Sequence, residues 1–163
     1  GIDIGIGDVI VPKHKKREIP TQLNGFDSPI VNTYSIETTV AEKIDAILDL
    51  MEFSSRMKDY CDISYLADRF DFDGKILTEA LSKTFEARGH NFNRNRFEKV
   101  ILFAENQAMQ KKWEMFSRKI DTKTDDFATV LKTIEAFLKQ PFIAATENTN
   151  FEKHWSALNK EWK

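Results

Sequence analysis

One stretch of the chain, residues 40–66 (VAEKIDAILDLMEFSSRMKDYCDISYL), carries charged side chains where helices would be expected to be apolar. Its apolar residues recur at steps of three and four, which predicts two amphipathic helices joined at a polar elbow, residues 52–55. Lys43 falls at the edge of the first apolar stripe, and Asp59 falls within the second. Because an unpaired buried charge is costly, these two residues are the first candidates for chemistry.

Two interpretations of Lys43 and Asp59 are open. They could form a structural ion pair that ties the helices together, or they could serve a ligand. Asp59 lies one turn into its helix, where the helix dipole favours an acid, but the dipole does not explain why it faces the apolar arc. Small residues flank Lys43, namely Thr39 and Ala46, and leave room for something larger than lysine. Asp45 is expected on the polar side of the first helix.

The start of the chain reads as strand. Residues 2–11 (IDIGIGDVIV) alternate apolar with small or acidic residues, which predicts a strand with one buried face and Asp3 on the other. A second strand is predicted at residues 29–34, so any sheet is small. The basic run PKHKKR at residues 12–17 is interpreted as a solvated loop, with a phosphate or nucleic-acid contact as the alternative.

The remainder of the chain has helical periodicity from residue 36 onward. Ser35 and Asp73 are predicted N-caps, and Gly89 ends the helix that follows Asp73. Further helices are predicted over residues 97–103 and 107–120 and from residue 125, with Pro141 interrupting the last helix and polar coil at residues 146–150. The fold class is therefore α+β and mostly α, organised in three parts: a small sheet (1–35), a helical domain (36–145) and a docked tail with Trp155 and Trp162 (146–163).

Composition excludes several classes of function. The formal net charge of -2 gives the chain no field for binding nucleic acid, and its one cysteine excludes an internal disulfide and fits a reducing cytoplasm. No apolar run approaches the roughly 20 residues of a membrane span, so we expect a cytoplasmic protein without membrane contact. The sequence contains no zinc-type histidine and cysteine spacing, Walker loop, dinucleotide fingerprint or G-x-S-x-G motif.

Three stretches together resemble the AbiEii toxin family: IDIGIGD (2–8), YSIETTVAEK (34–43) and RMKDYCDISYL (56–66). The members of this family are bacterial nucleotidyltransferase-like toxins of abortive-infection, type IV toxin–antitoxin systems. The most specific pieces are the A-E-K helix and the K-D-x-x-D helix start that follows it. The resemblance covers most of the chain and implies that the small sheet is the remnant of a nucleotidyltransferase-like sheet, followed by a helical bundle.

The resemblance also implies an active site. Asp3 matches the strand carboxylate of the metal-binding set, which holds Mg²⁺ in the complete enzyme. Lys43 matches the lysine that binds nucleotide phosphates, and Asp59 matches the acid beside the active site. Supporting roles in nucleotide binding fall to three neighbours: Arg56, Lys58 and Asp62.

One part of the family pattern has no match in this chain, namely a Gly-Ser turn followed by a D-x-D strand. We expect that motif upstream of Gly1, which would make the chain the C-terminal part of a larger enzyme. Alone, the chain is then expected to be inactive and to bind Mg²⁺ weakly. The partners that the resemblance implies are a nucleoside triphosphate, an RNA (tRNA) or protein acceptor, and a cognate antitoxin. The alternative is a non-catalytic helical interaction module in which Lys43 and Asp59 form a structural ion pair.

Overall fold

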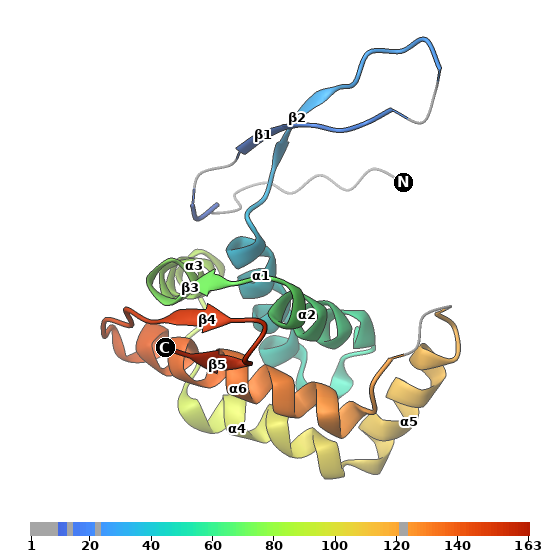
Figure 1. Cartoon of the computed structure of the whole chain (residues 1–163). Helices are drawn as coiled ribbons and strands as arrows, with labels where there is room; N and C mark the ends of the chain where they lie inside the picture. The colour runs from blue at the N-terminus through green and yellow to red at the C-terminus, as the bar shows by residue number, and fades with distance from the viewer. Residues whose placement is uncertain (1–9, 13–14, 22–23, 121–123) are drawn as a thin grey trace.

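The computed structural model describes residues 10–12, 15–21, 24–120 and 124–163. These residues form six α-helices, two short 3-10 helices and five short strands (Figure 1). In chain order the elements are β1 (Lys15–Glu18), β2 (Ile30–Thr33), α1 (Ile36–Leu50), η1 (Met51–Phe53), α2 (Met57–Arg69), β3 (Phe72–Asp73), α3 (Gly74–Arg88), α4 (Arg94–Ile101), η2 (Leu102–Glu105), α5 (Gln107–Ser117), α6 (Phe127–Glu147), β4 (His154–Ser156) and β5 (Glu161–Trp162). The α+β, mostly helical class that the sequence predicts is confirmed.

The helices form one bundle around a continuous core. α1 packs against α2 and α3, and the long helix α6, orange in Figure 1, packs across α2, α3 and α4. Apolar residues at helical spacing supply the buried contacts, as the amphipathic stripes predict. The largest fully buried side chains are Trp155, Tyr60, Phe72, Phe97, Phe137, Phe142, Ile44, Ile47, Leu48, Met57, Ile63 and Leu77.

Local capping sets the ends of the helices that the sequence predicts best. The Ser35 side chain accepts a hydrogen bond from the backbone of Thr38 at the start of α1, and Asp73 accepts one from Ile76 at the start of α3. Gly89 ends α3 in the left-handed conformation, with φ of +68°. All three predicted boundaries are confirmed.

The predicted interruption at Pro141 is wrong, because α6 continues through it as far as Glu147. A proline has no backbone N–H, so it leaves the carbonyl of residue 137 without its intrahelical donor. The indole Nε1 of Trp162 donates to that carbonyl oxygen of Phe137 at 2.9 Å. The tail thus satisfies the group that the proline leaves open, and the coil predicted at residues 146–150 begins only after the helix ends.

The C-terminal tail pairs with the helical body as strands that the sequence analysis did not predict. β4 lies between β3 and β5 in an antiparallel sheet, in which Trp155 is opposite Phe72 and Trp162. The Trp155 indole donates to the carbonyl oxygen of Ala67 at 2.8 Å. The backbone of Gly74 lies so close to the tail that a Cβ there would be 2.7 Å from the Lys153 carbonyl oxygen.

A two-stranded hairpin precedes the helices and extends away from them at the N-terminal end of α1 (Figure 1). The strand predicted at residues 29–34 is confirmed as β2, and its partner β1 includes Lys15 and Arg17. The interpretation of the basic run as a loop is therefore wrong for residues 15–17, while residues 13–14 lie outside the described residues. Backbone pairing needs no apolar side chain, and the described side chains of β1 stay exposed, so a charged strand is tolerated there. Residues 2–9 of the strand predicted at 2–11 lie outside the described residues.

Candidate functional site

α1 and α2 fold back on one another at the polar elbow, and this brings the two charged residues of the sequence analysis into contact. The Lys43 ammonium lies 3.0 Å from Oδ1 of Asp59 and 2.7 Å from Oδ2 of Asp62. Lys43 comes from the middle of α1, and both acids come from the first two turns of α2. The positions of Lys43 and Asp59 on the apolar faces of the two predicted helices therefore correspond to a contact between α1 and α2.

Two further cations complete this group. The Arg56 guanidinium donates from Nε to Oδ2 of Asp59 at 2.6 Å, and the Lys58 ammonium lies 2.6 Å from Oδ2 of Asp62. We call Lys43, Arg56, Lys58, Asp59 and Asp62 the α1–α2 charge cluster. With three cations and two carboxylates, it has an excess of positive charge that would favour an anionic ligand.

Burial differs across the α1–α2 charge cluster. The Asp59 side chain is 4% exposed and that of Lys43 is 19% exposed, whereas Arg56 and Lys58 are largely in solvent. Burial alone would lower the pKa of Lys43, but its contacts with Asp62 and Asp59 outweigh burial and raise the pKa above its ordinary value. Burial opposes the charge of Asp62 as well, but Lys43 and Lys58 lower the pKa of that carboxyl. Lys43 is therefore a fixed positive charge at neutral pH.

Comparison with protein families decides the kind of protein that carries this cluster. A family model described as "Nucleotidyl transferase AbiEii toxin, Type IV TA system" matches residues 1–140, which is most of the chain. The chain belongs to the AbiEii family. No match was found among curated proteins or among solved structures. The resemblance predicted from the sequence is confirmed, and membership implies a nucleotide substrate and a cognate antitoxin for this AbiEii chain.

The described residues of the AbiEii chain do not by themselves form a ligand set for a Mg²⁺ ion. Among them, no group of three or more histidine, cysteine, aspartate or glutamate side chains could hold a metal. Asp59 and Asp62 are the acids of the charge cluster, and cations already contact both carboxylate oxygens of Asp59 and Oδ2 of Asp62. Asp3, to which the family resemblance assigns the metal, lies outside the described residues.

The sequence predicts that Asp45 lies on the polar side of α1, and that prediction is wrong. Asp45 is completely buried, because the end of α3 and the loop after it cover this side of α1. His90 Nδ1 lies 2.8 Å from Oδ1 of Asp45, and Arg88 Nη1 lies 3.3 Å from Oδ2. Both partners lie more than 40 residues away along the chain, so no local sequence signal marks the contact.

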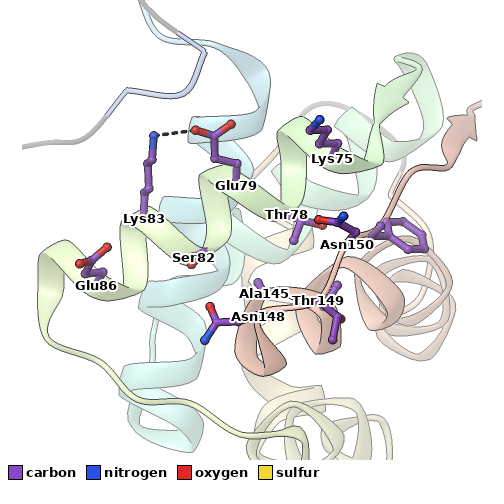
Figure 2. A pocket seen from close by; sticks show the side chains of 12 residues that line it. Lys75, Thr78, Glu79, Ser82, Lys83, Glu86, Ala145, Asn148, Thr149 and Asn150 are labelled. Carbon is purple, nitrogen blue, oxygen red and sulfur yellow. Dashed lines mark hydrogen bonds and ion pairs between the residues drawn. The ribbon is translucent and has the colours of Figure 1, made fainter.

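The AbiEii chain also has a cavity that the charge cluster does not line. It has a volume of about 400 Å³ and lies between α3 and the end of α6, with Thr78 and Asn150 among the residues that line it (Figure 2). Its polar lining includes the Lys83–Glu79 ion pair, at 2.6 Å. The sequence does not predict this cavity, and its lining mixes charges of both signs.

For the part of the chain that the structure describes, none of the AbiEii helices combines the length and the apolar character that crossing a membrane would require.

Proposed function

We propose that this chain carries the phosphate-binding side of a Mg²⁺-dependent nucleotidyltransferase toxin, with Lys43 as the residue that contacts the phosphates. The observation that supports this most directly is the ammonium of Lys43, held between two carboxylates at the position that the family pattern assigns to its lysine. A fixed, partly exposed cation suits a ligand that carries several negative charges.

Lys43 would act on the charge that develops during transfer. In phosphoryl and nucleotidyl transfer the leaving group gains negative charge, and a positioned cation stabilises it. Asp59 and Asp62 would position the Lys43 ammonium, because each is hydrogen-bonded or ion-paired to it. Arg56 and Lys58 are the more exposed cations, so they are the ones that can turn toward an incoming phosphate.

The metal part of this proposal rests on the family and on Asp3. When bound, Mg²⁺ would neutralise part of the triphosphate charge, and Asp3 is the carboxylate of this chain that we assign to it. The 163 residues contain no Gly-Ser turn followed by a D-x-D strand. We therefore expect the isolated chain to bind nucleotide without transferring it, and to hold Mg²⁺ weakly. For the toxin we propose a cytoplasmic location, with an RNA such as tRNA, or a protein, as the acceptor.

The substitution Lys43→Met tests the role of the lysine. We expect nucleoside triphosphate binding, measured by calorimetry, to weaken about tenfold or more, because a charge-assisted contact is lost. Folding should suffer less than the 3–5 kcal/mol typical of an orphaned buried charge, at about 1–2 kcal/mol. The reason is that Asp59 keeps Arg56 and Asp62 keeps Lys58.

Lys83→Met is the matched control. Lys83 forms an exposed ion pair with Glu79 within α3, away from the helices that carry the charge cluster. It should leave nucleotide binding unchanged. Unaltered binding in Lys43→Met, together with a large loss of stability, would instead support the structural ion pair of a non-catalytic interaction module. Transfer of labelled nucleotide to RNA or protein by the isolated chain would contradict the expectation that it is inactive.

A further inference from the structure

An aromatic side chain stands in solvent beside the α1–α2 charge cluster. Phe53, in the elbow between α1 and α2, is 85% exposed, while the neighbouring Ser54 is buried. Phe53 precedes Arg56 by three residues, and three residues of chain span at most about 11 Å. The backbone positions of Phe53 and of Arg56, an exposed cation of the cluster, are therefore no more than about 11 Å apart.

The backbone on both sides of Phe53 is held in place. The Lys112 ammonium, from α5, donates to the carbonyl oxygen of Glu52 at 2.7 Å and to that of Ser54 at 3.0 Å. The buried Ser54 hydroxyl in turn accepts a hydrogen bond from the backbone N–H of Arg56 at 3.1 Å. The exposure of Phe53 thus does not come from a loose loop, since the elbow is fixed while the ring projects from it.

An exposed ring on a fixed backbone, close along the chain to the cations of the cluster, has the two properties of a nucleotide site. The face of an aromatic ring stacks on any nucleobase, and neighbouring cations attract the phosphates. Stacking alone tolerates every base and favours those with the larger ring system. A ring left in water without a ligand gains nothing for the fold, because its apolar area is not buried.

We propose that Phe53 is the nucleobase platform of this site, on which the base stacks while the phosphates reach Arg56 and Lys43. This inference rests on the proposed function of Lys43. It adds a specificity: the site accepts all four ribonucleoside triphosphates and prefers the purine nucleotides, whose bases cover more of the ring.

The test compares a nucleotide with its phosphates alone. Binding of ATP, GTP, CTP and UTP and of inorganic tripolyphosphate is measured by calorimetry for the wild type and for Phe53→Ala, Phe53→Trp and Lys43→Met. Phe53→Ala should weaken ATP binding roughly tenfold or more and leave tripolyphosphate binding within about twofold. Phe53→Trp should keep ATP binding, whereas Lys43→Met should weaken both ligands.

Phe26→Ala is the matched control, because Phe26 is another exposed phenylalanine, 68% exposed, in the segment between β1 and β2. It should not change ATP binding, and the melting temperature of Phe53→Ala should match that of the wild type. An unchanged ATP affinity in Phe53→Ala, or an equal loss for ATP and tripolyphosphate, would overturn the platform while leaving the role of Lys43 intact. A wild type that binds neither ligand would overturn the role of Lys43 and the platform with it.

Discussion

Two buried aspartates on neighbouring helices differ in the charge that compensates them. Each carboxylate oxygen of Asp59 contacts one cation: Oδ1 lies 3.0 Å from Lys43 Nζ, and Oδ2 lies 2.6 Å from Arg56 Nε. Oδ1 of Asp45 lies 2.8 Å from Nδ1 of His90. Oδ2 of Asp45 accepts no hydrogen bond from the described residues, and Nη1 of Arg88 lies 3.3 Å from it. Burial raises the pKa of Asp45, and His90 and Arg88 offset this only in part. An ionised Asp45 therefore destabilises the fold relative to a protonated one.

The substitution Asp45→Asn should expose this difference through pH. A carboxyl whose pKa is higher in the folded state keeps its proton longer there, so its contribution to stability is full below the ordinary value of 3.8 and is lost as pH rises through the folded pKa. Asparagine has no such titration. The stability of Asp45→Asn relative to the wild type should therefore increase with pH, as measured by urea unfolding between about pH 3.5 and 5.5, below the ordinary titration range of histidine.

Asp62→Asn is the counterpart with the opposite sign. Lys43 and Lys58 overcome the effect of burial and lower the pKa of Asp62, so its contribution is present above 3.8 and is lost as pH falls through the folded pKa. The deficit of Asp62→Asn should shrink toward acid pH, while the relative stability of Asp45→Asn falls. Parallel pH profiles for the two variants would contradict the assignment of both shifts.

At the scale of single elements, the sequence predicts what local chemistry decides. The ends of α1 and α3 follow from Ser35, Asp73 and Gly89, because a cap acts within a few residues of its own position. The same holds for the contact between Lys43 and Asp59, since both lie on stripes that must face each other across a short elbow. These parts of the fold and of the candidate site were predictable without knowledge of tertiary packing.

What the sequence could not predict depends on partners far along the chain. Pro141 is tolerated in α6 because Trp162 supplies the missing donor, and Asp45 is buried because His90 reaches it from the loop after α3. The three-stranded sheet likewise joins β3 to two strands of the tail. Local propensity contains no information about such contacts. From propensity alone, Pro141 predicts a break in the helix and Asp45 predicts an exposed side chain.

The contact between the tail and α6 makes a coupled prediction. Trp162→Phe removes the indole donor and leaves the buried carbonyl of Phe137 unpaired, at an expected cost of about 1–3 kcal/mol. Pro141→Ala restores the backbone N–H that can bond this carbonyl within the helix. In the Pro141→Ala background, Trp162→Phe should therefore cost less, and a double-mutant cycle by urea unfolding measures the difference.

Trp155→Phe is the control for that cycle. Its indole donates to the carbonyl oxygen of Ala67 in α2. No proline lies in α2, so this hydrogen bond does not replace one that a proline removes. It should be destabilising to a similar degree, with little coupling to Pro141→Ala. Equal costs of Trp162→Phe in both backgrounds would mean that the indole hydrogen bond does not compensate for the proline.

At the scale of the whole molecule, the hairpin and the helical bundle meet at a small joint. The strands β1 and β2 pack mainly against each other, and an isolated two-stranded ribbon is marginally stable. Three hydrogen bonds tie the preceding chain to the start of α1: Val11 N–H donates to the Thr38 hydroxyl, and the Thr38 and Ser35 hydroxyls donate to the Val11 carbonyl. Thr38 and Val11 are both buried at this joint.

The substitution Thr38→Val should loosen the joint without unfolding the bundle. Valine has nearly the same shape but can neither donate nor accept, so the N–H of Val11 loses its partner while the Ser35 contact remains. We expect hydrogen exchange of Val11 and of β1 and β2 to accelerate about tenfold or more, with exchange in α3 and α6 unchanged. Thr39→Val is the matched control, because the Thr39 hydroxyl donates to the Ser35 carbonyl at the start of the same helix. Equal acceleration in the hairpin and in α6 would show that the two parts unfold as one cooperative unit.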